Sequence, residues 1–316
     1  MLKIRKHTSL LQRYPSVVSA NNLDRSRSQT LIYGESISPQ MILQIEALLG
    51  ASLGLTAAWK VGRYDCLLAT TAYSAQLEQC VISQRLDIAD VRDVPDLQGP
   101  GLVVMDMDST AIEIECIDEI AVLAGVGPQV AEVTERAMQG DLDFEQSLRQ
   151  RVATLAGADA SILETVRATL PLMPELRELV ATLHHYGWKA AIASGGFTYF
   201  SDHLKQELRL AHAQSNKLEI IDGKLTGKVL GEIVDANAKA RILHALAEEH
   251  GIALHNTIAV GDGANDLVMI NAAGLGVAYH AKPKVEKAAP VAVRYADLGA
   301  VICLLSVSLL PQQLDW

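Results

Sequence analysis

The sequence predicts an α/β fold with a doubly wound, mostly parallel sheet, preceded by a small α+β domain. Three observations lead to this prediction. After residue 100, apolar segments with the character of buried strands alternate with segments of helical spacing, as is typical of parallel sheets covered by helices on both faces. A linker-like segment precedes this alternation. Three of the strands end in polar clusters, and ligands bind beyond the carboxyl ends of parallel strands, so we expect a functional site there.

The predicted linker is Val91–Pro100, because VRDVPDLQGP contains two prolines, a glycine and alternating charges. We assign residues 1–95 to the small N-terminal domain and residues 96–316 to the α/β domain. The elements expected before the linker are strands at Thr30–Gly34 and on either side of Gly62, and helices at Ser38–Gly50 and Ser74–Arg85. None of these segments carries an obvious catalytic motif.

The α/β domain begins with the apolar strand GLVVMDMD, Gly101–Asp108, which ends in carboxylates. A helical pattern follows from about Cys116 to Leu183, with breaks at glycines and prolines. The remaining expected elements are a strand at Trp188–Gly196, a hairpin at Leu218–Gly231, a helix at Ala238–Gly251, and strands in Asn256–Asp266 and at Gly274–Tyr279.

Composition and charge exclude several classes of protein. The formal net charge is −10, which argues against nucleic-acid binding. The four cysteines are scattered, with no C-x-x-C pair or zinc-site spacing, which favours a reducing cytoplasm. Gln12, Arg13 and Pro15 interrupt the apolar stretch that a secretory signal needs. The apolar patches Leu48–Trp59 and Ala300–Leu310 are far shorter than the roughly 20 residues that span a membrane. We expect a soluble, cytoplasmic protein.

Asp106 and Asp108 form a D-x-D pair where the first strand ends. Two close carboxylates repel unless a cation lies between them or one is protonated. Asp106 could attack phosphorus as a nucleophile, and Asp108 could supply and later remove a proton. The alternative is a hydrogen-bonded cap of the strand, which is the commoner role of an isolated D-x-D.

Asp262 and Asp266 lie in VGDGANDLVM, where glycines allow the backbone to turn tightly beside a ligand. A few carboxylates completed by waters and a substrate phosphate suit Mg²⁺. The spacing excludes an EF-hand, and the alternative is an Asp-Gly turn that precedes a helix. Ser194-Gly195-Gly196 ends the second strand and could form an anion nest. A serine hydrolase is not supported, because the Ile-Ala that precedes Ser194 lacks the first glycine of the G-x-S-x-G elbow.

Lys239, near the start of the helix before the third strand, could neutralise a phosphoryl group, although most single lysines are solvated on the surface. Taken in order, DMDST, SGG, this lysine and GDGAND resemble the four motifs of the haloacid dehalogenase superfamily. The stretches MDMDSTAIEIECIDEIA, VTERAMQGDLDFEQSLRQRVATL, ASGGFT and VGDGANDLVMI resemble most closely its phosphoserine phosphatases. The likeness runs from Gly101 to about Ser306 and leaves residues 1–95 uncovered.

This resemblance implies a Rossmann-like sheet with a mobile helical cap inserted after the first strand, at about residues 111–183. It implies that Asp106 is the nucleophile and Asp108 the acid and base. Mg²⁺ would be held by the Asp106 side chain, the Asp108 backbone carbonyl and Asp262, with Asp266 in contact with these ligands. The residues implied to bind the substrate are Ser194, Gly195, Lys239 and Asn265 at the phosphoryl group, Glu115 at its ammonium, Arg151 at its carboxylate, and Met138 and Phe144 as walls.

The implied reaction is hydrolysis of O-phospho-L-serine, the last step of L-serine biosynthesis, through an aspartyl phosphate. A phosphate, a carboxylate and an ammonium on one small molecule do require an anion nest, a planar fork and an anion. Two alternatives stay open, namely another small phosphomonoester or acceptor alcohol, and an amino-acid-binding regulator without catalysis. We expect a homodimer.

Overall fold

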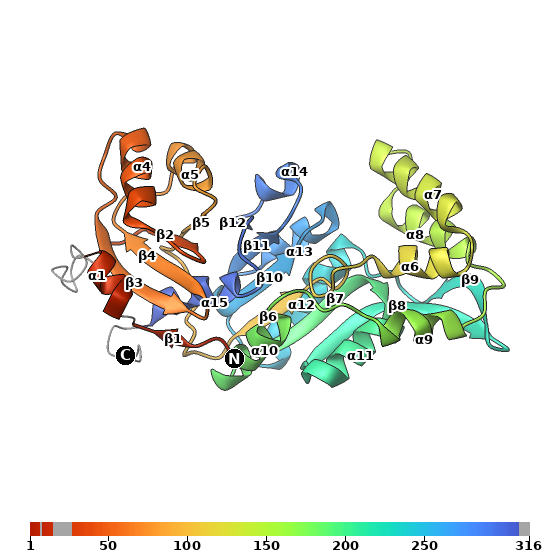
Figure 1. Cartoon of the computed structure of the whole chain (residues 1–316). Coiled ribbons are helices and arrows are strands. Elements are labelled where there is room, and N and C mark those ends of the chain that lie inside the picture. Colours follow the sequence, from red (N-terminus) through yellow and green to blue (C-terminus); the bar gives the residue numbers. More distant parts are fainter. Residues whose placement is uncertain (7, 15–26, 310–316) are drawn as a thin grey trace.

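Seven strands form the central sheet, in the order β12-β11-β10-β6-β7-β8-β9 (Figure 1). All neighbouring pairs are parallel except β8 and β9, which form an antiparallel hairpin. The computed structural model describes residues 1–6, 8–14 and 27–309. Pro15, which interrupts the apolar stretch near the N-terminus, and residue 310, the last of the apolar patch Ala300–Leu310, lie outside this range. Because β6 runs parallel to both β7 and β10, the carboxyl ends of these three strands meet at one edge of the sheet.

The strands of this sheet are β6 (Leu102–Met105), β7 (Lys189–Phe197), β8 (His212–Ile221), β9 (Lys224–Leu230), β10 (Thr257–Gly261), β11 (Leu275–Tyr279) and β12 (Val291–Val293). The helices of the same part of the chain are α6 (Cys116–Leu123), α7 (Gly127–Gln139), α8 (Phe144–Ala153), α9 (Ser161–Ala168), α10 (Leu176–His185), α11 (Thr198–Leu208), α12 (Ala236–Glu249), α13 (Leu267–Ala272), α14 (Pro283–Glu286) and α15 (Ala300–Leu305).

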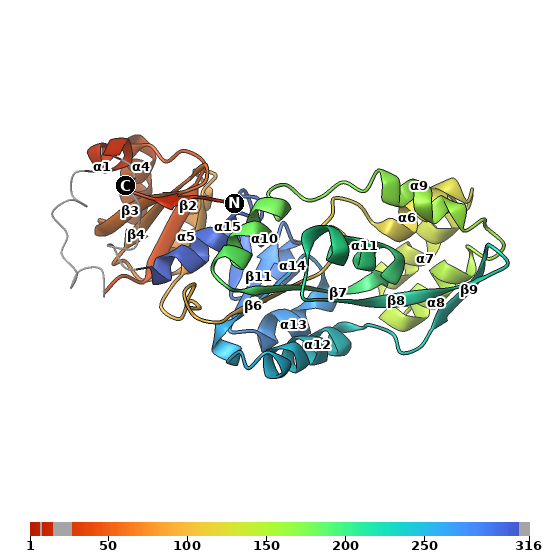
Figure 2. The ribbon, with the colours of Figure 1, turned by 90° about the horizontal axis from the view of Figure 1, so that it is seen from below.

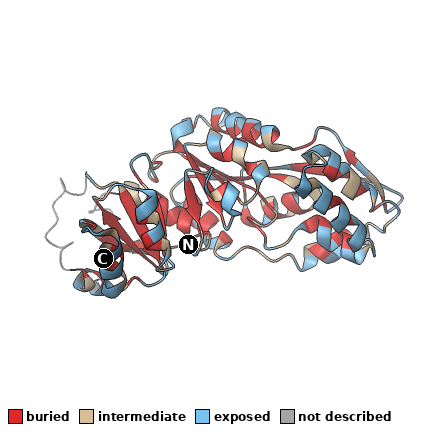
Figure 3. Cartoon of the chain, turned by 90° about the horizontal axis from the view of Figure 1, so that it is seen from above, coloured by how far each residue is buried: buried red, intermediate tan, exposed pale blue. Residues whose placement is uncertain are grey.

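Helices cover both faces of the central sheet (Figure 2). On one face, α12 and α13 pack through apolar residues such as Leu243 and Ile270 against the small side chains of β7 and β10. On the other face, α10 and α11 bury Leu179 and Phe200. The strands between them are buried along almost their whole length (Figure 3). This explains why the sequence of each strand is continuously apolar.

The N-terminal module, which we define as the described residues before Val91, contains a separate sheet in the order β1-β3-β4-β2-β5, with all pairs antiparallel. Its elements are β1 (Ile4–Arg5), α1 (Thr8–Arg13), β2 (Thr30–Gly34), α4 (Pro39–Leu49), β3 (Leu55–Val61), β4 (Tyr64–Ala69), α5 (Ala75–Ile82) and β5 (Asp87–Asp90). α4 begins after Ser38, whose side chain accepts from the Met41 amide, and ends at Gly50 in the left-handed conformation.

This module is docked on the central part through buried polar contacts. The Trp59 indole donates to Ser306 Oγ at 2.8 Å. The Asp87 carboxylate accepts from three consecutive amides, those of Arg294, Tyr295 and Ala296, at 2.8–3.1 Å. Both residues are completely buried, and the larger apolar cluster continues from the N-terminal sheet into α15. Buried donors and acceptors matched in this way favour one fixed arrangement of the two parts.

The cap helices, α6–α9, lie at the opposite end of the molecule from the N-terminal module (Figures 1 and 2). The β8–β9 hairpin extends beneath them, and amides of Gly157 and Ala160 donate to the carbonyls of Leu225 and Gly223 at 2.8 Å. The helical stretch expected as cap, residues 111–183, also contains α10. The structure instead packs α10 against β7 and α15, because its apolar face covers the central sheet.

Glu175 lies where the chain leaves the cap helices and enters α10, and it adopts the left-handed conformation with φ 65°. Its carboxylate accepts from the Tyr64 hydroxyl at 2.7 Å and from the Gly299 amide at 3.1 Å. Arg63 Nε lies 3.2 Å from the same carboxylate. One of the two connections to the cap is therefore fixed by the turn between β3 and β4 of the N-terminal module.

The predicted fold class is confirmed, with a doubly wound, mostly parallel sheet and a small N-terminal sheet. The expected strands and helices are present. The strands β1, β5 and β12 and the helices α1, α11, α13, α14 and α15 were not predicted from the sequence. None of the helices in the described part of the chain combines the length and the apolar character needed to cross a membrane.

Candidate active site

Asp106 lies directly after β6, at the carboxyl edge of the central sheet. Its amide donates to the Val260 carbonyl at 2.9 Å, which extends the pairing with β10. One carboxylate oxygen accepts from the Met107 amide at 2.7 Å, and the other lies 2.7 Å from Lys239 Nζ. The carboxylate is therefore held in one orientation while the residue still lines a cavity.

Lys239 is completely buried beneath the sheet edge, between Asp106 and Asp266. Helix α12 places it there, since the Asp235 side chain caps the helix by accepting from the Ala238 amide at 2.7 Å. Lys239 Nζ lies 2.6 Å from Asp266 Oδ1. Burial alone would lower the pKa of Lys239, but the charges of Asp106 and Asp266 outweigh burial and raise it. This lysine is therefore a fixed cation.

Three carboxylates converge at this edge, with one oxygen each of Asp106, Asp262 and Asp266 within 4.8 Å of one another. Burial and the charge of Asp106 raise the pKa of Asp262 to about 6. Thr110 donates to Asp262 at 3.1 Å. Lys239 is one cation against three acidic groups, so the donor set fits a further hard cation such as Mg²⁺. Both oxygens of Asp266 are already used, by Lys239 and by the Gly263 amide.

Asp108 follows on a tight turn in which Ser109 adopts a left-handed conformation with φ 55°. Residues two apart on a strand share one face, and although the chain is already turning here, Asp108 lines the same cavity as Asp106. Burial, followed by the negative charges of Glu115 and Asp106, raises the pKa of Asp108 well above its usual value. The pair therefore consists of one carboxylate held by a lysine and one carboxyl that keeps its proton to higher pH than an ordinary aspartate.

Ser194, Gly195 and Gly196 end β7 on the other side of Asp106. The Gly196 amide donates to Ser194 Oγ at 3.0 Å. A Cβ on Gly195 would lie 2.5 Å from the ring of Phe144, so the cap helix α8 contacts this loop where there is no side chain. Asn216, which was not predicted from the sequence, is buried, donates to the Gly195 carbonyl at 2.8 Å and accepts from the Val234 amide at 2.9 Å. A polar residue inside a strand pattern was its only signal.

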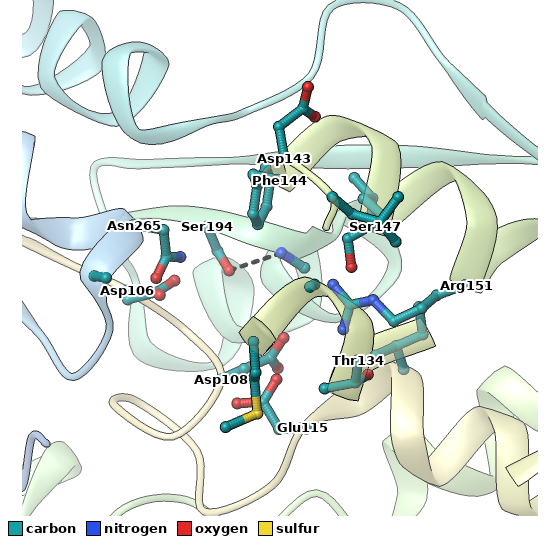
Figure 4. Close-up of a pocket in the computed structure, with 18 of the residues that line it drawn as sticks. Asp106, Asp108, Glu115, Thr134, Asp143, Phe144, Ser147, Arg151, Ser194 and Asn265 are labelled. Atoms are coloured by element: carbon teal, nitrogen blue, oxygen red, sulfur yellow. Dashed lines mark hydrogen bonds between the residues drawn. The ribbon is translucent and has the colours of Figure 1, made fainter. Parts of the chain in front are cut away.

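The cavity at this edge has a volume of about 380 Å³ and lies between the central sheet and α7 and α8 (Figure 4). The sequence-predicted residues that line it are Asp106, Asp108, Glu115, Met138, Phe144, Arg151, Ser194, Gly195, Asp262 and Asn265. Lys239 and Asp266 do not line the cavity. Lys239 binds Asp106 from beneath, and Asp266 binds Lys239. Three polar residues that line it from the cap were not predicted from the sequence, namely Thr134, Asp143 and Ser147.

The cap contributes charges of both signs to the cavity. Glu115 precedes α6 and accepts from the Ser109 hydroxyl at 2.9 Å, and burial is the largest cause that raises its pKa. Arg151 lies in the last turn of α8, where burial lowers its pKa against the attraction of nearby carboxylates. Met138 is 70% exposed and lies at the rim. A ligand with both an ammonium and a carboxylate matches this pair of charges.

Comparisons with known proteins identify the family of the chain. Residues 100–274 match the model of the haloacid dehalogenase-like hydrolases, and residues 26–90 match a domain of unknown function, DUF5609. The chain is 58% identical to the phosphoserine phosphatase of Vibrio cholerae serotype O1, over 100% of this chain and 96% of that protein.

Solved structures are also similar to the chain. The unliganded crystal structure of a probable phosphoserine phosphatase from Vibrio cholerae aligns with a TM-score of 0.92 and 58% identity, over 100% of this chain and 98% of that one. A phospho-aspartyl intermediate analogue of phosphoserine phosphatase aligns with a TM-score of 0.61 and 40% identity, over 64% of this chain and 97% of that one. The chain therefore belongs to the haloacid dehalogenase-like hydrolases, in the branch of the phosphoserine phosphatases.

Proposed function

We propose that this protein hydrolyses O-phospho-L-serine to L-serine and phosphate through a phosphorylated Asp106. The single observation that carries the proposal is the cavity itself. It combines a lysine-bound carboxylate with a cap that presents Glu115 and Arg151. The full-length relative at 58% identity is a phosphoserine phosphatase, and a solved relative is an analogue of the phospho-aspartyl intermediate.

In the first half-reaction, a carboxylate oxygen of Asp106 attacks phosphorus, and the bond from phosphorus to the serine oxygen breaks. Asp108 donates its proton to that oxygen, because its raised pKa favours the protonated form of the carboxyl. In the second, Asp108 takes a proton from a water that attacks the aspartyl phosphate. Phosphate leaves and Asp106 is regenerated.

The negative charge of the transferred phosphoryl group requires donors that are already oriented. Lys239, held by two carboxylates, supplies a positive charge at Asp106. Ser194 and the Gly195 amide form the nest for phosphoryl oxygens, and Asn265 reaches the cavity from the loop after β10. Asn216 positions this nest through its bond to the Gly195 carbonyl.

Recognition of the serine part is assigned to the cap. Glu115 binds the ammonium group and Arg151 the carboxylate, while Met138 and Phe144 enclose the substrate. Closure of the cap over the cavity excludes water from Asp106 during the first step.

The assigned metal is Mg²⁺, and its proposed ligands are the Asp106 side chain, the Asp108 backbone carbonyl and Asp262. Support comes from the convergence of three carboxylates within 4.8 Å and from the raised pKa of Asp262. When bound, the ion would neutralise charge on the phosphoryl oxygens as a Lewis acid. Asp266 stays bound to Lys239 rather than to the ion, since both of its oxygens have partners.

Location and assembly are further proposals. We assign the protein to the cytoplasm, since its four cysteines, Cys66, Cys80, Cys116 and Cys303, are all unpaired and buried. The expected homodimer stays a prediction, which light scattering of the purified protein would test.

The decisive experiment measures phosphate release from O-phospho-L-serine by the wild type and by Asp106→Asn, each with Mg²⁺ and with EDTA. Turnover that requires both Mg²⁺ and Asp106 is the expected result. A wild type that cleaves an aryl phosphate but not phosphoserine would refute the substrate and leave the nucleophile standing. Arg151→Ala should reduce phosphoserine turnover far more than turnover of that aryl phosphate.

A further inference from the structure

Ser147 lies on α8 one helical turn before Arg151, and both side chains line the same cavity (Figure 4). Residues four apart on a helix share one face, with about 5–6 Å between their Cβ atoms. The Ser147 side chain therefore stands beside the guanidinium, on the wall that faces the catalytic aspartates.

The hydroxyl of Ser147 has no hydrogen-bond partner among the described residues, although the residue is only 4% exposed. A buried helical serine usually bonds to a carbonyl of the preceding turn. Thr134, which lines the cavity from α7, does so by donating to the Val130 carbonyl at 3.1 Å. Of these two hydroxyls from the cap, the one of Thr134 is already used, and the one of Ser147 is left for a ligand.

Arg151 has no carboxylate within 4.0 Å in the described part of the chain, and its Nε is buried without a hydrogen-bond partner. A buried guanidinium without a partner is costly unless an anion completes it. A carboxylate has two oxygens and about four acceptor positions, more than one guanidinium fills. The geometry of α8 leaves the Ser147 hydroxyl as the neighbouring donor for that anion.

We infer that the Ser147 hydroxyl donates to the same substrate carboxylate as Arg151, and that Ser147 is a specificity-determining residue. It favours phosphorylated amino acids over phosphomonoesters that carry an ammonium but no carboxylate. This inference rests on the proposed function, because it assigns one more contact to the proposed substrate.

The test compares two substrates that differ only in the carboxylate, O-phospho-L-serine and O-phosphoethanolamine. The measured quantity is the ratio of their kcat/KM values for the wild type, Ser147→Ala and Thr134→Val. A hydrogen bond to a charged group predicts that Ser147→Ala lowers this ratio about 10- to 100-fold, mainly through KM for phosphoserine. Thr134→Val keeps the ratio of the wild type, since its hydroxyl serves Val130.

Each outcome separates this inference from the function on which it rests. If the wild type does not prefer phosphoserine over phosphoethanolamine, the enzyme makes no productive contact with the carboxylate. In that case both the proposed function and the role of Ser147 fail. A wild-type preference that Ser147→Ala leaves intact overturns only the role of Ser147. Equal losses on both substrates also overturn it, because they indicate a general disturbance of α8.

Discussion

Lys239 shows at the scale of one residue how the site resolves a conflict of charge. Three carboxylates lie close together, and water is excluded from the lysine between two of them. Desolvating an ammonium costs several kcal/mol, and two ion pairs at 2.6–2.7 Å offset that cost. The lysine thereby fixes the orientation of Asp106 before any substrate binds.

Lys239→Met should abolish turnover and destabilise the fold, because it leaves Asp106 and Asp266 buried without their cation. We expect a loss of about 3–5 kcal/mol in the free energy of unfolding, measured by urea denaturation. Lys284→Met, at an exposed position of α14, is the matched control and should change stability by less than about 0.5 kcal/mol. Full stability in Lys239→Met would contradict this view of the site.

Glu115→Gln should shift the pH dependence of catalysis, because the charge of Glu115 contributes to the raised pKa of Asp108. Removing that charge stabilises the Asp108 anion, so its pKa falls and the protonated acid is lost at lower pH. The alkaline limb of the kcat/KM profile should therefore move to lower pH. The measurement uses glycerol 2-phosphate, which has no ammonium for Glu115 to bind, and Glu119→Gln on the exposed side of α6 should leave the profile in place.

At the scale of elements, the end of β10 and the helical turn after it determine where Asp266 lies. A Cβ on Gly261 would lie 2.4 Å from Asp266 Cγ, so strand and turn approach as closely as a glycine permits. This contact holds Asp266 against Lys239, and through Lys239 it affects Asp106.

Gly261→Ala should displace Asp266 and lower kcat at least tenfold without changing any charge. Steady-state kinetics with phosphoserine measures this effect. Gly127→Ala, where the nearest atom to the added Cβ is 3.6 Å away, should leave kcat at the value of the wild type. An unchanged kcat in Gly261→Ala would show that the position of Asp266 is not important for turnover.

Much at these two scales can be predicted from sequence, because the signals are local. The strand ends at Asp106 and Asp262 and the caps of α4 are contained within a few residues. The missed strands β1, β5 and β12 contain only two to four residues, too few for a period to show. Asn216 acts through Gly195 and Val234, which are distant in sequence, and the role inferred for Ser147 depends on a ligand. Helical spacing likewise does not distinguish α10, on the central sheet, from the cap helices.

At the scale of the whole molecule, two parts with separate sheets are joined by matched polar groups. Asp87 on β5 binds three amides of the segment after β12, and burial raises its pKa even though these amides oppose the shift. The interface between the two parts depends on this buried carboxylate, because water could bind the three amides in its place only if the interface opened.

Asp87→Ala should cost about 2–3 kcal/mol of unfolding free energy, because it leaves three buried amides without an acceptor. KM for phosphoserine should not change, since the cavity lies at the other side of the central sheet. Urea denaturation and steady-state kinetics measure the two quantities. Asp90→Ala, on the same strand but paired with the exposed Arg92, should cost less than about 0.5 kcal/mol. Equal losses from both variants would show that the three amide bonds do not stabilise the joint.

The anchoring of Glu175 has a consequence for the kinetics of opening. Because Tyr64, Arg63 and Gly299 hold this residue, the chain on the α10 side of it cannot turn with the cap. Rotation of the cap must be absorbed in the few residues between α9 and Glu175 and in the turn after Asp108. Arg63 lies outside the cavity, yet together with Tyr64 it holds the pivot at Glu175. The N-terminal module thereby limits where the cap can turn.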